Sequence, residues 1–328
     1  MANQALTSVG ALNLALKQEM ARDKSVMVYG EDVGVEGGVF RVTEGLQKIY
    51  GKDRCFDSPL SEAGIIGTAI GLAINGMKPV VEMQFDGFVM EGLPQILDHA
   101  ARMRNRSRGA FTVPMVVRFP YGGGIKALEH HSEAMESVFG HIPGLKVVIP
   151  STPFDAKGLL ISAIRDPDPV IFLEPKRLYR AFKQEVPEEE YFIPIGKAAL
   201  IQDGTDVTLL AYGAMVRECQ KAAIEAHKMG ISCMVVDLRS ISPLDRDAIL
   251  FSAEKTGRVV IVHEASRTFG AAGEISMLIY KHLYGKLKAP IERVTGFDIA
   301  MPLLRGEDLY LVDSFRVLEG IKKVMGKA

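Results

Sequence analysis

Glu62 stands where a single carboxylate could do chemistry. It lies in the stretch SPLSEAG at 58–64, after a proline and a serine and directly before a run that predicts a helix. Ser61 would be the N-cap and Glu62 a first-turn acid, which meets unpaired backbone N–H groups and the positive end of the helix dipole. That structural role is ordinary, so this stretch alone leaves a catalytic role for Glu62 open.

A glycine-rich segment, YGEDVGVEGGVFRVTEGL at 29–46, follows a predicted strand and contains Glu31 and Asp32. Its glycines match neither the dinucleotide-binding fingerprint nor a phosphate-binding P-loop. We expect a flexible acidic loop at the carboxyl end of the strand, where open α/β sheets bind their ligands. Whether the two acids face a ligand or only solvent stays open.

A third segment, PYGGGIKALEHHSEAMES at 120–137, runs from a glycine-rich loop into His130, His131 and Ser132, which we place at the start of a helix. Adjacent histidines point in different directions and make a poor metal pair. Two interpretations remain, a proton-transfer or hydrogen-bonding role and a surface histidine beside an N-cap.

Gly64, Gly67 and Gly71 follow Glu62 in the same predicted helix. Glycine costs up to about 1 kcal/mol at a helical position, so this cluster needs a structural reason. The spacing of three and four residues places the glycines on one face of the helix. Either another helix of this chain packs there, or a second subunit or a cofactor does.

The composition of the 328 residues narrows the class of protein. Lys and Arg total 39 against 40 Asp and Glu, so the chain lacks the basic excess that drives binding to nucleic acid or anionic membranes. The three cysteines, Cys55, Cys219 and Cys233, are odd in number and widely spaced, which fits small core residues in a reducing cytosol better than disulfides or a zinc site.

No apolar run reaches membrane-spanning length. The first segment, MANQALTSVGALNLALKQEM, has no basic residue before Lys17, unlike a signal peptide. We expect an amphipathic helix there, with Leu6, Leu12, Leu16 and Met20 among its buried positions, and a cytoplasmic protein without a targeting segment.

Short β-branched runs alternate with longer helical patterns, which predicts an α/β protein built from parallel βαβ units. The first domain, 1–180, would be a doubly wound parallel sheet. A charged, proline-punctuated segment predicts a linker at 181–195, and a second α/β domain would follow at 196–328. Strands are expected at 25–30, 79–85, 114–119, 145–150, 169–174, 206–212, 231–238, 258–264 and 291–296, and helices at 63–75, 89–107, 153–165, 214–229, 244–254, 271–285 and 313–325.

These segments carry a family resemblance over nearly the whole chain. GEDVG, FDSPLSEAGIIGTAIGLAINGMKPVVEMQF, PMVVRFPYGGG, HIPGLKVVIPSTPFDAKGLLISAIRDPDPVIFLEPKRLYR and EKTGRVVIVHEA resemble the β subunit of thiamine-diphosphate-dependent 2-oxo acid dehydrogenases. The resemblance implies a pyrimidine-binding first domain and a transketolase C-terminal-like second domain. It also implies decarboxylation of a 2-oxo acid and transfer of the acyl group to a lipoyl group of an acyltransferase.

The resemblance assigns roles to particular residues. It implies that Glu62 hydrogen-bonds a ring nitrogen of the cofactor's aminopyrimidine and so activates the cofactor without touching the substrate. His131 matches a histidine at the active-site mouth that handles the acyl group, and Glu31 and Glu91 resemble acids that line a water-filled passage between two sites. The expected cofactor-binding set is Glu62, Leu60, Gln84, Phe88 and Glu31.

A monovalent cation, K⁺, is also implied, held mainly through backbone oxygens of Met115, Ala163, Asp166 and Asp168. The glycine-aspartate-glycine signature that binds the diphosphate and Mg²⁺ is absent, because QDGTDV lacks the first glycine and is expected to be a turn. The chain would therefore be half of an active site. An α subunit would supply the diphosphate and Mg²⁺ contacts in an α₂β₂ heterotetramer, and the second domain would help to dimerise the β subunits and dock the acyltransferase.

The sequence departs from the family pattern at two places, the first bearing on the substrate and the second on Phe88. KALEHHS replaces the commoner family pattern, so Glu129 and His130 alter the rim of the substrate channel, and FDGFVMEGLPQI is less aromatic than usual. Pyruvate is the first expectation, with branched-chain 2-oxo acids and acetoin as alternatives. A non-catalytic α/β scaffold subunit is the alternative of another class, and a transketolase-like transferase is a rival with the same cofactor.

Overall fold

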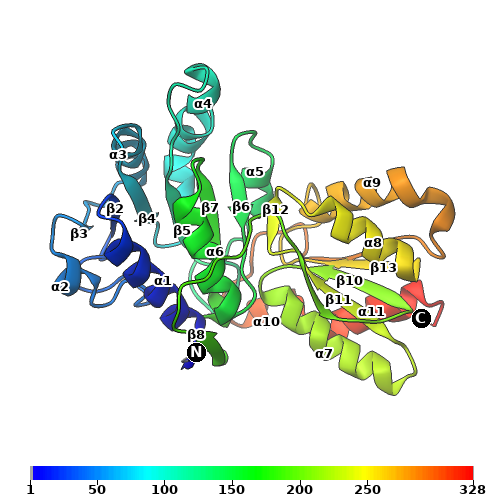
Figure 1. Cartoon of the computed structure of the whole chain (residues 1–328). Coiled ribbons are helices and arrows are strands. Elements are labelled where there is room, and N and C mark those ends of the chain that lie inside the picture. Colours follow the sequence, from blue (N-terminus) through cyan, green and yellow to red (C-terminus); the bar gives the residue numbers. More distant parts are fainter. Residues whose placement is uncertain (1–2, 328) are drawn as a thin grey trace.

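The computed structural model describes residues 3–327, which form two α/β halves side by side (Figure 1). The first half contains a seven-stranded sheet in the order β12-β6-β7-β5-β4-β2-β3, parallel except for β12. Its strands are β2 (Val26–Gly30), β3 (Cys55–Asp57), β4 (Lys78–Glu82), β5 (Val116–Tyr121), β6 (Lys146–Val148), β7 (Val170–Pro175) and β12 (Ser240–Ser242).

Helices cover both faces of this sheet, as predicted for a doubly wound domain. Neighbouring strand residues point to opposite faces. Val80 packs with α1 (Ser8–Arg22) and α6 (Pro153–Arg165), whereas Val81 packs with α3 (Glu62–Ile74). The remaining helical pieces of this half are α2 (Leu46–Tyr50), η1 (Phe88–Gly92), η2 (Gln95–Ala100), α4 (Met103–Arg106), α5 (Glu136–Gly140) and η3 (Lys176–Leu178).

The second half is a five-stranded sheet in the order β14-β13-β10-β11-β9, in which β9 alone runs antiparallel. α7 and α11 pack on one face, and α8 and α9 on the other. The elements are β9 (Ala199–Gln202), β10 (Val207–Ala211), α7 (Ala214–Lys228), β11 (Cys233–Asp237), α8 (Arg246–Thr256), β13 (Val259–Val262), α9 (Ala271–Leu283), η4 (Tyr284–Lys286), β14 (Glu292–Val294), η5 (Leu304–Gly306), α10 (Glu307–Tyr310) and α11 (Ser314–Val324).

The predicted strands and helices are present, with boundaries shifted by a few residues, except in the region 89–107. That predicted helix is divided into η1, the π-helical turn η2 and α4. Pro94 has no N–H to donate, which interrupts a regular α-helical ladder. The N-terminal helix is confirmed as α1, whose Leu12, Leu16 and Met20 are buried, but Leu6 lies before it, partly buried in a strand.

The predicted linker at 181–195 is not structureless. It contains β8 (Gln184–Pro187), which pairs antiparallel with β1 (Asn3–Leu6). Lys157 of α6 also donates hydrogen bonds to the carbonyls of Pro187 and Glu189. These contacts attach the segment to the first half along much of its length.

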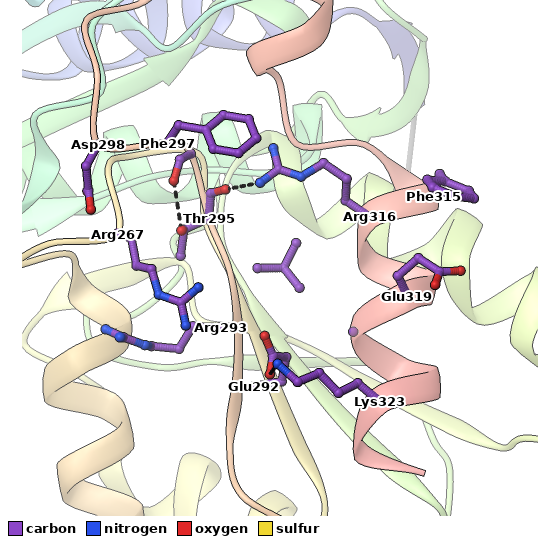
Figure 2. A pocket seen from close by; sticks show the side chains of 13 residues that line it. Arg267, Glu292, Arg293, Thr295, Phe297, Asp298, Phe315, Arg316, Glu319 and Lys323 are labelled. Carbon is purple, nitrogen blue, oxygen red and sulfur yellow. Dashed lines mark hydrogen bonds and ion pairs between the residues drawn. The ribbon is translucent and has the colours of Figure 1, made fainter. Parts of the chain in front are cut away.

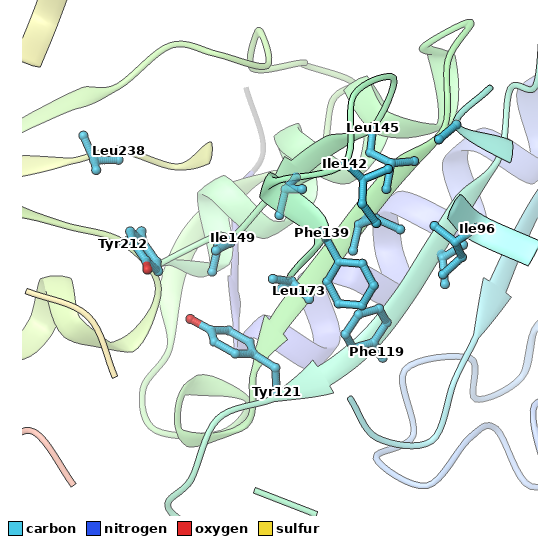
Figure 3. Close-up of a cluster of buried hydrophobic side chains, with 14 of the residues drawn as sticks. Ile96, Phe119, Tyr121, Phe139, Ile142, Leu145, Ile149, Leu173, Tyr212 and Leu238 are labelled. Carbon is cyan, nitrogen blue, oxygen red and sulfur yellow. The ribbon is translucent and has the colours of Figure 1, made fainter. Parts of the chain in front are cut away.

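One hydrophobic cluster spans both halves (Figure 3). Phe119 and Phe139 pack with ring centroids 5.6 Å apart in the first half, and Tyr212 and Leu238 join them from the second. The three cysteines are free and buried. Within residues 3–327, the helices are too short or too polar to cross a membrane.

Candidate active site

Glu62 is the first residue of α3, and Ser61 caps that helix as predicted by accepting a hydrogen bond from the N–H of Gly64 at 3.3 Å. The start of α3 is fixed to β2, because the Tyr29 hydroxyl donates to the carbonyl of Ile65 at 3.0 Å. Glu62 is only 9% exposed. Its carboxylate accepts no hydrogen bond from residues 3–327, so it is available to an N–H donor from outside the chain.

Glu31 follows β2 directly and is buried beside Glu62, whereas Asp32 is exposed. Burial, with the charges of Glu62 and Asp32, raises the pKa of Glu31 to about 7. The loop that carries these acids is held in place rather than free, since the N–H of Gly34 donates to Asp57 at 2.6 Å and that of Gly38 to the carbonyl of Asp32 at 2.8 Å. Of the two alternatives left open, exposure to solvent applies to Asp32, whereas Glu31 is buried.

The other predicted cofactor contacts differ in their surroundings. Gln84, just beyond β4, donates to the Asp32 carboxylate at 3.1 Å. Phe88, in η1, is partly buried. Leu60 is 80% exposed, and Glu91 is also exposed. The apolar side chain of Leu60 is therefore accessible to a cofactor or to a second subunit.

His131 lies against two aromatic rings. Its imidazole centroid is 4.3 Å from that of Phe85 and 5.1 Å from that of Phe88, and Nδ1 is 2.8 Å from the carbonyl oxygen of Glu129. If Nδ1 donates to that carbonyl, Nε2 is the acceptor left free for a ligand. The aromatic pair thus joins Phe88, a predicted cofactor contact, to His131, a predicted catalytic residue.

The residues around His131 correct one expectation. His130, Ser132 and His131 are not at the start of a helix, because α5 begins only at Glu136. His130 has a positive φ of 65° and an exposed side chain, so the two histidines do point apart. Gly87 is required beside them, since a Cβ there would collide with the backbone of His130.

Two neighbours of His131 were not predicted from the sequence. Phe85 precedes the predicted contact Phe88 in the same segment, so its position was a usable signal. Lys176 donates a hydrogen bond to the carbonyl of His131 and is buried. It lies in the charged stretch EPKRLYR, which gives no sign that it contacts a loop 45 residues earlier in the chain.

The predicted cation ligands lie near one another at the end of α6 and the starts of β5 and β7. The carbonyl of Met115 accepts the N–H of Val170 at 3.0 Å, and that of Ala163 accepts the N–H of Asp166 at 3.3 Å. Lys146 contacts the Asp166 carboxylate at 2.6 Å, and Arg104 contacts Asp168 at 2.6 Å. A K⁺ site here stays a prediction, and QDGTDV is a turn between β9 and β10, as expected.

A cavity of about 470 Å³ lies elsewhere, at the β14 edge of the second sheet (Figure 2). Its acid Glu292 pairs with Lys323 at 2.7 Å, and Asp298 accepts two hydrogen bonds from Thr268. Arg316 donates to the carbonyl of Thr295. None of the predicted site residues lines this cavity, so it is separate from the candidate active site.

Comparison with known proteins is consistent with this arrangement. Residues 4–181 match the transketolase pyrimidine-binding domain, and residues 196–317 match the transketolase C-terminal domain. The solved structure described as "Split gene transketolase, inactive beta4 tetramer" has a TM-score of 0.77 at 19% identity, covering 98% of this chain and 100% of that one, which shows a shared fold.

Two curated relatives are much more similar in sequence. The pyruvate dehydrogenase E1 component subunit beta of Acholeplasma laidlawii is 56% identical over 319 residues, covering 97% of this chain and 98% of that protein. The protein of the same name from Bacillus subtilis (strain 168) is 52% identical over 320 residues, covering 98% of each. The chain therefore belongs to the family of pyruvate dehydrogenase E1 component β subunits.

Proposed function

We propose that this chain is the β subunit of a pyruvate dehydrogenase that decarboxylates pyruvate and transfers the acyl group to the lipoyl group of an acyltransferase. The observation that carries this proposal is Glu62, a nearly buried carboxylate without a donor from its own chain, beside the buried acid Glu31. The chain that carries Glu62 is 56% identical to a relative named pyruvate dehydrogenase E1 component subunit beta.

The residues present fit thiamine diphosphate. Glu62 would accept a hydrogen bond from the aminopyrimidine ring and hold it in place, while Phe88, Leu60 and Gln84 would contact that ring. When bound, thiamine diphosphate supplies the nucleophilic carbon and the electron sink for loss of carbon dioxide. Glu31, whose raised pKa keeps a share of it protonated at neutral pH, would donate or accept a proton beside Glu62.

His131 would act on the acyl group at the mouth of the site. In the tautomer with a proton on Nδ1, its Nε2 can accept a proton or a hydrogen bond from the substrate or from the incoming lipoyl thiol. Phe85 and Phe88 hold the imidazole from two sides, which restricts the directions in which Nε2 can point.

The chain would be active only with an α subunit, as a cytoplasmic α₂β₂ heterotetramer. The α subunit would supply the contacts to the diphosphate and Mg²⁺, since the chain lacks the corresponding sequence motif. The exposed Leu60 supports this division, because an apolar side chain at the site is open to a partner. The second domain would help to dimerise the β subunits and dock the lipoyl acyltransferase, and a K⁺ ion would bind near Asp166.

The test is to purify the tagged chain with the α subunit that accompanies it in its native cells. Release of carbon dioxide is then measured from pyruvate and from 3-methyl-2-oxobutanoate, and acetoin cleavage is followed in parallel, each with and without thiamine diphosphate and Mg²⁺. We expect cofactor-dependent turnover that is fastest with pyruvate, and acylation of an added lipoyl domain. Faster turnover of the branched-chain acid or of acetoin would reassign the substrate, and an inactive complex would contradict the enzyme assignment.

A further inference from the structure

Lys176 is a buried cation directly behind His131. It begins η3, after β7, and is 4% exposed. Its ammonium donates a hydrogen bond to the carbonyl oxygen of His131 and lies 5.4 Å from the centroid of the Phe85 ring. The same ring packs against the imidazole of His131 at 4.3 Å. Lys176 therefore contacts the backbone of His131 and the ring on which the His131 side chain rests.

Carboxyl groups from both domains surround this ammonium. Burial lowers the pKa of Lys176, and the charges of Asp86, Glu264, Glu307 and Glu133 oppose that effect. Asp86 is fully buried, and neither of its oxygens has a hydrogen-bond partner within residues 3–327. These carboxyl groups offset part of the cost of burying a cation here.

Apart from the packing of its ring on Phe85 and Phe88, the other hydrogen bonds of His131 stay within its own loop. The N–H of His131 donates to the carbonyl of Leu128 at 3.2 Å, and the imidazole contacts the carbonyl of Glu129; both partners belong to the same loop. The contact with Lys176 ties the His131 backbone to the end of a sheet strand instead. Without it, the His131 carbonyl would lose its donor from the rigid part of the domain.

We propose that Lys176 is a positioning residue that holds His131 in the orientation needed for acyl transfer. This inference rests on the proposed function, because it assigns Lys176 a role through His131. A shift of about 1 Å in a catalytic group can cost about 10²-fold in rate, so an anchor at the backbone of that group has a measurable effect.

The chain offers a matched control in Lys157. It too is a buried lysine, it donates to the carbonyls of Pro187 and Glu189, and its ammonium lies 4.7 Å from the Tyr191 ring centroid. Burial lowers its pKa as well. Lys157 thus shares with Lys176 its burial, a backbone carbonyl acceptor and a nearby aromatic ring, but it has no contact with the candidate active site.

The experiment is a double-mutant cycle in the assembled complex, with pyruvate and a lipoyl domain as substrates. We expect Lys176→Met to lower kcat for lipoyl acylation about 10²-fold with little change in KM for pyruvate. Lys176→Met combined with His131→Ala should be no slower than His131→Ala alone, within about twofold. Lys157→Met should leave kcat within about twofold, alone or with His131→Ala.

If the rate losses of the two single substitutions multiply in the Lys176→Met/His131→Ala variant, the proposal is overturned. If Lys176→Met fails to assemble, Lys176→Leu, which also removes the N–H donor, replaces it in the same cycle with the same expectation of non-additive rates.

A second measurement separates this inference from the proposed function. Amide hydrogen exchange across 122–133 should become about tenfold faster in Lys176→Met and stay unchanged in Lys157→Met, whatever the substrate is. Unchanged exchange in Lys176→Met overturns the positioning role. A wild-type complex that turns over no 2-oxo acid contradicts only the proposed function, since the exchange comparison still decides whether Lys176 holds the loop.

Discussion

At the scale of single residues, the candidate site depends on two acids that the fold brings together from separate segments. Glu31 directly follows β2 and Glu62 begins α3, and the charge of Glu62 contributes to the raised pKa of Glu31. The raised pKa favours the protonated form of Glu31, whereas the Glu62 carboxylate accepts no hydrogen bond within residues 3–327. Glu31 can therefore hold a proton near neutral pH beside the Glu62 carboxylate.

Glu62→Gln tests the acid that would contact the cofactor. We expect turnover of pyruvate to fall about 10²- to 10⁴-fold while the complex still assembles, because glutamine keeps the shape but not the carboxylate. Asp247→Asn is the control: Asp247 is also a first-turn acid, at the start of α8, and is exposed. Full activity in Glu62→Gln, measured as carbon dioxide release, would favour a scaffold subunit instead.

Glu31→Gln tests the raised pKa through stability. Because the pKa of Glu31 is about 7 in the folded chain and near 4.5 in the unfolded chain, the folded state binds the proton more tightly. Folded wild type therefore loses stability as the pH rises from about 4.5 to 7, and the penalty is constant above that. The variant should be more stable than wild type by about 1 kcal/mol at pH 8, after allowance for solvent near the loop, and equal to it at pH 4.

Urea unfolding of the full chain at these two pH values gives the comparison. An equal difference in unfolding free energy at both would mean that the substitution acts by packing and not through the proton.

Sequence reasoning singled out Glu31, Glu62 and His131 as candidates because each stands in a motif with its own local signal. Phe85 and Lys176 were not identified, although both contact His131. Their contacts depend on how β4 and β7 are placed in the sheet, which short segments do not encode. His130 was predicted at a helix start but lies before α5, with a positive φ and its backbone packed closely on Gly87, a contact between distant segments that its local sequence does not encode.

At the scale of elements, α3 carries the glycine cluster, and the structure separates the two explanations for it. Around Gly71 no atom lies within 4 Å of an added Cβ, and at Gly67 the nearest is Gln95 at 3.7 Å. Within residues 3–327, no helix packs tightly against Gly67 or Gly71. The face is therefore open to a partner.

Gly71→Ala should make the isolated chain more stable by up to about 1 kcal/mol, because alanine is the better helix former and has room there. Gly76→Ala is the contrasting control. Space around Gly76 is equally open, but its φ of +92° is unfavourable for alanine, so a loss of about 1 kcal/mol is expected. Thermal unfolding of both variants measures the two effects, and a loss at Gly71 would reveal a contact that the structure does not contain.

In the complex, we expect Gly67→Leu to prevent association with the α subunit, since a large side chain would keep the partner from this face. Co-purification measures the effect, with Gly71→Ala as the conservative comparison. A Gly67→Leu chain that still captures its partner in equal yield would place the interface elsewhere.

Strands that lie within longer apolar runs were predictable, including β6 and β14, which have only three residues each. β3, β9 and β12, with three or four residues, were not predicted. They form because they add to the edge of a sheet that already exists. Whether such a strand forms depends on pairing with the adjacent strand of the sheet, so local propensity carries little information about it.

At the scale of the whole molecule, the two domains are joined more closely than their separate sheets suggest. β12 belongs in sequence to the second half but pairs with β6 of the first. Beside it, Arg239 contacts Asp155 of α6 at 2.5 Å, and its N–H donates to Asp237 at the end of β11 at 2.9 Å. This crossing was invisible in the sequence, where 196–328 was predicted as a separate domain.

Arg239→Met tests this joint. Asp155 and Asp237 are buried, and burial with the charge of Asp155 raises the pKa of Asp237. Removing the guanidinium leaves two buried carboxylates without their cation, which should cost about 3–5 kcal/mol at pH 8. The loss should be smaller at pH 5, because Asp237, with its raised pKa, is then protonated and the repulsion is relieved. Urea unfolding gives both values, with the exposed Arg246→Met as a control expected to change little.

Because one hydrophobic cluster also spans the two halves, wild type should unfold in a single transition. Two separate transitions in wild type, or an equal loss at both pH values in Arg239→Met, would show that the halves are stabilised independently of this contact.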